Sequence, residues 1–352
     1  MSLYQVNLLN IALMVISTVV AFVLPFELFL FSYAVLGPLH YLTEISWLHD
    51  RKYFMSRRSF AWPLLGLTLV LLVTSQAWFR FDAGSTLHGA APWASSILAY
   101  ITSWSAEVTL GAFAISLVFV VAKTASGRWL GTLGTAVLVL VAHLFNQGWR
   151  EARGESMGYT GYEVFFLVFL TTIVHVFLFT GAFVLFGALK SKSRSGMISM
   201  VVFGACALIC VLVPVSGKAE VTGYVKEAYD RSSTTLNVYL SRLIEPNTYG
   251  DQVYATPLGI KVARFIAYAY TYHYLNWFSK TSVIKWHEAS VSRLAVVAVI
   301  WIASVAVYGY SYLLGLDVLF FLSMLHVLLE FPLNWHSFFG IGSELMARAR
   351  AA

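Results

Sequence analysis

Long apolar stretches follow one another along nearly the whole chain, and short polar connections separate them. A membrane-spanning helix needs roughly 20 apolar residues, and ten stretches reach about this length. They cover residues 5–24, 27–48, 61–81, 95–122, 128–148, 163–188, 196–215, 257–278, 292–315 and 317–338. Pro25 separates the first two stretches, and Leu316-Asp317 separates the last two. The pattern predicts an all-α polytopic membrane bundle of about ten transmembrane helices, with residues 1–352 in a single transmembrane domain.

The basic residues gather in the connections on one side of this predicted bundle. Of the 23 Lys and Arg residues, 14 follow the second, fourth, sixth, eighth or tenth stretch. The connections at 82–94 and 316–317, on the opposite side, contain none. Because positively charged short loops stay in the cytoplasm, this asymmetry predicts that both termini are cytoplasmic, the N-in, C-in topology.

The longest connection, residues 216–256, falls on the outer side in this topology. Between Val221 and Ile244 its apolar residues lie partly at helical spacing. This pattern predicts an amphipathic helix that lies on the outer surface or caps the bundle.

Composition excludes most other classes of protein. Hydrophobic residues make up 59% of the chain and charged residues 11%, whereas soluble domains have about 25% charged residues. The net charge of +6 is explained by the short basic loops and does not require nucleic acid, so membrane lipid is the expected surrounding. The two cysteines, Cys206 and Cys210, lie in one apolar stretch and indicate small buried side chains rather than a disulfide framework.

Histidines are the candidate chemical residues, because ionisable side chains inside a bilayer are costly and usually face the protein interior. Seven of the nine lie in or beside the apolar stretches: His40, His49, His143, His175, His273, His326 and His336. His287 follows the eighth stretch in a cytoplasmic connection. The predicted topology places His40, His273 and His326 at similar depth in the membrane.

Two histidines belong to matching sequence boxes. Leu39 to Glu44 and Leu325 to Glu330 both read L-H-x-L-x-E, and each is followed by a Trp and a second His. A His and a Glu four residues apart share one helix face. They can bind one metal ion together, or the carboxylate can orient the imidazole as an outer partner. If the two boxes form one site, the imidazoles of His40 and His326 should lie within about 5 Å of each other, with His273 no farther away.

The first box, Gly37-Pro38-Leu39-His40-Tyr41-Leu42-Thr43-Glu44, resembles the G-x-P-H-G-A-L-D box of the bacterial β-carotene-cleaving dioxygenases, the bacteriorhodopsin-related-protein-like family. The box from Leu325 to Phe331 resembles the late P-H-x-x-x-x-D-F box of that family, and Tyr272-His273 resembles its F-x-x-x-H segment. His143 stands where the family has a further box, although no acid follows it at the matching position. The third family box has a second His where this chain has Trp277.

The resemblance implies an all-helical fold in a bacterial inner membrane and a four-histidine non-haem iron that splits a carotenoid double bond with O2. Carried over residue by residue, the metal ligands are His40, His143, His273 and His326, with His287 as a substitute. A divalent metal other than iron remains an alternative for this site. Glu44 and Glu330 would orient these ligands or bind the metal directly as catalytic residues.

The sequence thus predicts a membrane metalloenzyme, an iron oxygenase acting on a lipophilic substrate. The aromatic run of the eighth stretch would line the path of that substrate with Tyr270, Tyr272, Tyr274 and Trp277. Two other classes remain open at this stage. In a proton-coupled transporter the acids and histidines would carry protons, and in a non-catalytic subunit of a membrane complex the polar pairs would hold helices together.

Overall fold

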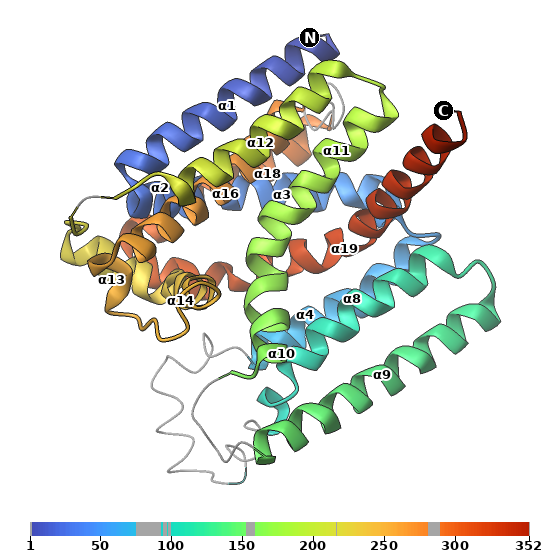
Figure 1. Ribbon diagram of the computed structural model, residues 1–352. Coiled ribbons are helices and arrows are strands. Elements are labelled where there is room, and N and C mark those ends of the chain that lie inside the picture. Colours follow the sequence, from blue (N-terminus) through green and yellow to red (C-terminus); the bar gives the residue numbers. More distant parts are fainter. Residues whose placement is uncertain are drawn as a thin grey trace. The chain divides into compact units, whose positions relative to one another are not determined.

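The computed structural model describes residues 2–74, 93, 97, 100–152, 159–215, 217–280 and 289–351, and every regular element in them is a helix (Figure 1). The chain divides into two compact units. The first comprises Met1–Trp47, Thr172–Gly315 and Ser337–Ala352, and the second comprises Leu48–Thr171 and Leu316–His336.

The first unit contains most of the helices. They are α1 (Leu3–Val23), α2 (Pro25–Phe31), the π-helix η1 (Ser32–Leu36), α3 (Gly37–Asp50), α11 (Thr180–Lys190), α12 (Arg194–Leu212), α13 (Gly223–Ser232), α14 (Thr234–Arg242), α15 (Gln252–Ala255), α16 (Pro257–Ser279) and α18 (Val291–Tyr310). The second unit contains η2 (Lys52–Phe54), η3 (Arg58–Phe60), α4 (Ala61–Thr74), α8 (Ser105–Val121), α9 (Ala125–Ala152) and α10 (Gly161–Glu163). The π-helix η4 (Val164–Phe179) continues from the second unit into the first, and α19 (Tyr312–Ala351) begins and ends in the first.

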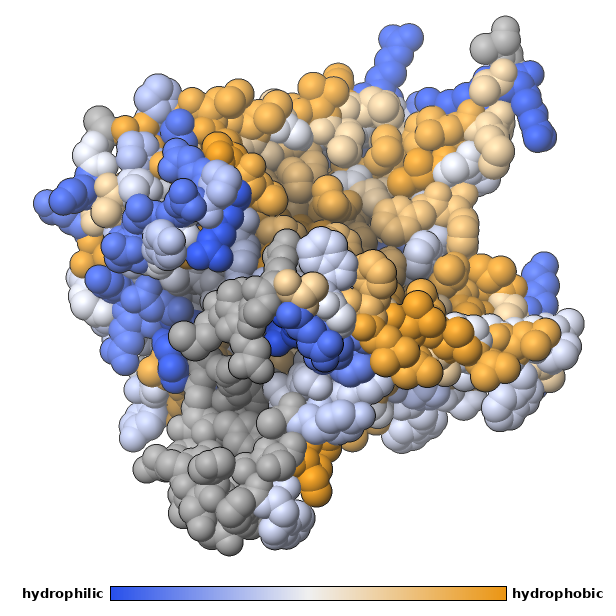
Figure 2. Space-filling view, turned by 60° about the horizontal axis from the view of Figure 1, so that its bottom comes forward, coloured by the Kyte–Doolittle hydropathy of each residue, from blue (hydrophilic) through white to orange (hydrophobic). Residues whose placement is uncertain are grey.

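Seven of the described helices are long and apolar enough to cross a bilayer. They are Leu3–Val23, Pro25–Asp50, Ala125–Ala152, Gly161–Lys190, Arg194–Leu212, Val291–Tyr310 and Tyr312–Arg350. Only 11% of the apolar window of α9, and likewise of α18, is buried inside the protein. Broad hydrophobic areas accordingly cover the face seen in Figure 2. Exposed apolar surface of this extent suits contact with lipid rather than water.

Prolines and caps set the helix boundaries. The predicted break at Pro25 is confirmed, because α1 ends at Val23 and Pro25 occupies the first position of α2, where its missing N–H costs nothing. The predicted break at Leu316-Asp317 is wrong. The chain leaves helical geometry at Ser311, and Asp317 lies within α19. Ser311 is extended and its hydroxyl accepts a hydrogen bond from the Leu314 N–H, so the serine caps the new helix.

The predicted helix over 221–244 is two short helices. Ser233, with φ −138° and ψ −8°, interrupts the helical geometry between α13 and α14. The Tyr229 ring from α13 is fully buried and lies 4.8 Å from the Phe26 ring of α2. Burial raises the pKa of Tyr229 to about 12, so its hydroxyl stays neutral and accepts a hydrogen bond from Asn237.

Helix α16 is the centre of the first unit. It packs against α1, α2, α12, α14, α15 and η1, and 16 of its 23 residues are buried. Gly259 allows the close approach of its first turn to the preceding segment, because a Cβ at this position would lie 2.5 Å from the carbonyl oxygen of Val253. A helix shielded by its neighbours can carry polar residues that a lipid-facing helix cannot. This shielded position explains why α16 can carry several tyrosines and His273.

Candidate metal centre

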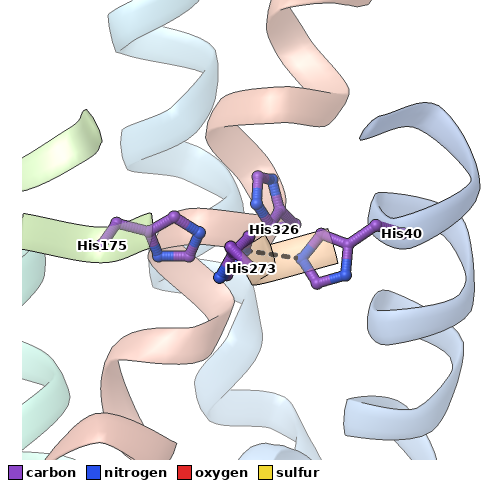
Figure 3. Close-up of side chains that lie close together, drawn as sticks. All are labelled: His40, His175, His273 and His326. Carbon is purple, nitrogen blue, oxygen red and sulfur yellow. Dashed lines mark hydrogen bonds between the residues drawn. The ribbon is translucent and has the colours of Figure 1, made fainter. Parts of the chain in front are cut away.

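Three buried histidines of the first unit form one group (Figure 3). They come from three different helices: His40 from α3, His175 from η4 and His273 from α16. Each offers one ring nitrogen, and these nitrogens all lie within 4.8 Å of one another. The three rings point toward one another in the close-up view, and each residue is at most 5% exposed.

This donor set fits a transition-metal ion. Neutral imidazole suits iron, zinc, copper and nickel, whereas calcium and magnesium prefer oxygen ligands. The Nε2 atoms of His40 and His273 are 3.0 Å apart, within hydrogen-bonding distance. Two nitrogens that bind one ion at about 2.1 Å each lie a similar distance apart, about 3.0–3.4 Å. The pair is therefore close enough to bind a single ion.

Side-chain hydrogen bonds hold α3 and η1 against α16 on both sides of the His40–His273 pair. The Trp277 indole N–H donates to the Thr43 hydroxyl at 3.0 Å. The hydroxyls of Tyr41 and Tyr274 are 3.1 Å apart, and a third bond, of 2.7 Å, joins Ser32 and Thr271. All six of these residues are buried. The two imidazoles are thus fixed by packed helices rather than by a loop.

Thr180 fixes the orientation of the His273 ring. Its hydroxyl oxygen lies 2.7 Å from His273 Nδ1, and both residues are buried. When Nδ1 carries the proton and donates a hydrogen bond to the Thr180 hydroxyl, the lone pair of Nε2 faces the other histidines and is free to bind a metal. Hydrogen bonds to the second ring nitrogen commonly set the tautomer of metal-binding histidines in this way.

We expect Thr180→Val to weaken metal binding by about 10–100-fold, the usual cost of losing such an outer partner. Valine has nearly the size of threonine but lacks the hydroxyl oxygen that accepts the hydrogen bond from Nδ1. Thr180→Ser retains the hydroxyl and should keep an affinity close to that of the wild type. Competition with a metal chelator measures the difference, and equal affinity of the valine variant and the wild type would contradict this role.

Glu44 approaches the same nitrogen of His40 that faces His273. Its Oε2 atom lies 3.0 Å from His40 Nε2, and the carboxyl group is 2% exposed. The sequence left open whether Glu44 orients His40 through its other ring nitrogen or binds a metal directly. A carboxylate beside Nε2 favours direct binding, because it lies at the metal-facing edge of the ring. Glu330 is also buried, at 1% exposure, four residues after His326 on α19.

The structure gathers two of the predicted ligands and adds one that the sequence did not assign. The predicted proximity of His40 and His273 is confirmed by nitrogen separations within 4.8 Å. The proximity of His326, which lies in the second unit, stays a prediction. His175 is the third member of the group, and His143 lies outside it. The only sequence signal for His175 is that no other ionisable residue lies between Glu163 and Lys190. His287 lies outside the described residues.

His143 belongs to a different contact, within the second unit. Its Nδ1 atom lies 3.5 Å from Glu107 Oε1, and Glu107 is fully buried. The Trp104 ring stacks on the imidazole with the ring centres 3.6 Å apart. A buried carboxylate needs a proton or a cationic partner, and His143 lies where it can supply that partner when its ring is protonated.

The predicted substrate-lining residues are all buried on α16. Tyr270 packs edge-on against Phe29, and the Tyr272 hydroxyl donates to the amide oxygen of Asn10. Tyr274 and Trp277 both flank His40, with ring centres 5.2 Å and 5.4 Å from the imidazole. The aromatic run thus surrounds one side of the histidine group.

No protein-family model, curated protein or solved structure matches the chain.

Proposed function

We propose that this protein is an integral membrane metalloenzyme in which His40, His175 and His273 hold one metal ion, with His326 as the further ligand that its sequence box predicts. The observation that carries the proposal is the convergence of three buried imidazoles of the first unit from three helices. Isolated intramembrane histidines can serve helix packing. Imidazole nitrogens that face one another at such short distances can bind a single transition-metal ion together.

Iron is the metal that we propose, with a non-haem oxygenase reaction. The support for iron is a donor set of imidazoles beside the buried carboxylate of Glu44, because histidine and carboxylate together are the usual ligands in non-haem iron oxygenases. A bound iron would supply activation of O2 there. The resemblance of the boxes around His40 and His326 to carotenoid-cleaving dioxygenases supports the same reaction class, although it assigned His143 where the structure has His175.

The substrate that we propose is lipophilic, carotenoid-like or lipid-like. The histidine group is buried within apolar and aromatic side chains, among them Tyr274 and Trp277. A charged or strongly polar substrate would lose its hydration on entering such surroundings without matching partners. The chain's own residues would hold the ligand set, exclude water by burial and keep His273 in one tautomer through Thr180.

The test of the proposal is elemental analysis of the full chain purified from membranes. About one iron per chain is expected, and protein that binds no transition metal after incubation with ferrous iron would overturn the metal site. In that case proton-coupled uptake into vesicles would favour the transporter class. The buried Glu107–His143 pair is the observation that would then support it.

We also propose ten membrane spans with both termini in the cytoplasm of a bacterium. The distribution of basic residues supports this orientation. A cysteine introduced at Ser56, which is exposed, should react with a membrane-impermeant thiol reagent only after the membrane is opened. The buried native Cys206 and Cys210 should contribute little background, and labelling of intact cells would overturn the topology.

A further inference from the structure

Arg264 lies within the apolar part of the first unit, on α16, and has no acidic partner. Its guanidinium carbon lies 4.2 Å from the centre of the Phe22 ring of α1. The Nε and Nη1 atoms are shielded from solvent and form no hydrogen bond with any described residue. The thiol of Cys210 on α12 is close enough to Arg264 to interact with it electrostatically. A positive charge with shielded, unused donors is costly unless an anion accompanies it.

The described helices around Arg264 supply no such anion. The sequences of α1, α12 and α16 contain no Asp or Glu, and Glu27 of the neighbouring α2 forms no hydrogen bond with the shielded Nε and Nη1 atoms. They supply a second cation instead, because Lys261 lies one helical turn before Arg264 on α16. The negative ends of the α1 and α12 dipoles lie nearby and stabilise a cation in part. They leave the hydrogen-bonding donors of the guanidinium unused.

The position of Arg264 along the helices indicates where the anion comes from. Phe22 is the penultimate residue of α1, and Cys210 is two residues from the end of α12. The guanidinium therefore lies at the ends of two helices that are long enough to span a bilayer, at the level where lipid headgroups begin. The surrounding surface is apolar: Val19, Val23, Leu208 and Leu212 are all more than half exposed. Lipid chains would cover such side chains.

We propose that Arg264 and Lys261 bind the phosphate of an anionic phospholipid at this end of the α1, α12 and α16 helices. The planar guanidinium can donate two parallel hydrogen bonds to phosphate oxygens, and the lysine ammonium adds a second charge. The acyl chains of the same lipid would lie on the exposed valines and leucines. This inference rests on the membrane integration proposed above and not on the metal site.

Native mass spectrometry of the full chain in detergent tests the inference, with phosphatidylglycerol and phosphatidylcholine of identical acyl chains as probes. We expect phosphatidylglycerol to bind about five- to tenfold more tightly, from the attraction of basic side chains to an anionic headgroup. Arg264→Gln should remove this preference, and Arg264→Lys should keep part of it. Arg242→Gln is the matched control, because Arg242 already donates to the Thr248 carbonyl and lies over the Tyr239 ring. The control should retain the wild-type preference.

Retention of the full preference by Arg264→Gln, or its loss in Arg242→Gln, would overturn the site. If excess inorganic phosphate alone displaces the lipid, the anion at this site is free phosphate, and the proposal of a lipid headgroup is wrong. The Lys variant keeps the test decisive if the Gln variant does not fold, since loss of part of the preference is expected only when the guanidinium binds the headgroup. Metal content, measured on the same samples, should be unchanged and separates this test from that of the metal centre.

Discussion

Replacing His273 with alanine should reduce the bound metal from about one ion per chain to less than a tenth of that value. His273 Nε2 lies 3.0 Å from His40 Nε2, and its Nδ1 is bonded to Thr180, so the variant loses a ligand that is already oriented. Loss of an outer partner costs about 10–100-fold in affinity, and loss of a direct ligand should cost more. Elemental analysis after dialysis against a weak chelator measures the result.

The matched control for His273→Ala is His49→Ala. His49 lies on the same helix as His40, but its side chain is half exposed and lies 3.7 Å from Asp50. This variant should keep the full metal content. Helix content and the size-exclusion profile should be preserved in both variants, because metal loss through unfolding is uninformative. A folded His273→Ala variant with the wild-type metal content would refute the metal centre.

Replacing His175 with alanine should release the metal, whereas replacing His143 should not. This contrast separates the observed ligand group from the one that the resemblance implies. His175 is 2% exposed, and its ring centre lies 4.9 Å from that of His273. His143 instead pairs with Glu107 under the Trp104 ring. We expect His175→Ala to lower the metal content as far as His273→Ala does.

The His143 variant needs a second substitution as its control. His143→Ala alone leaves the carboxylate of Glu107 buried without its partner, which typically costs about 3–5 kcal/mol of stability. Glu107→Gln combined with His143→Ala removes that charge and should restore part of the stability, measured as a melting temperature in detergent. Full metal loss in a folded double variant, with retention in His175→Ala, would show that His143 is the ligand.

The helical elements could be predicted because they depend on local pattern. Within the described residues the apolar runs of about 20 residues are helical apart from short breaks, such as the one at Ser311. Pro25 ends the first helix for a reason contained in the residue itself, the missing N–H. The boundary at Ser311 was missed because a serine cap is a weak signal within an apolar run, whereas Asp317 is conspicuous but tolerated inside α19.

Within the candidate site, the His–Glu pairs could be predicted because both members of each pair lie on one helix. His40 and Glu44 lie four residues apart, so the sequence alone puts them on one face, and the structure has them 3.0 Å apart. His175 has Phe179 at that spacing, and no local pattern marks it. It lies in the π-helix η4, whose wider turn changes the face that each residue presents. A helical wheel drawn with the α-helical period therefore assigns such a side chain to the wrong face of the helix.

The sequence by itself determined that the chain is helical and too apolar for water, and that His40 and Glu44, like His326 and Glu330, form pairs on single helices. These properties follow from composition and from contacts between near neighbours in the chain. The tertiary structure alone decided which histidines meet, because His40, His175 and His273 come from helices α3, η4 and α16 and their approach depends on how those helices pack. Packing also decided that Thr180 contacts His273 and that Glu107 contacts His143. Contacts between distant segments depend on the shapes of all the side chains that pack between them. The spacing of residues within one helix does not contain this information.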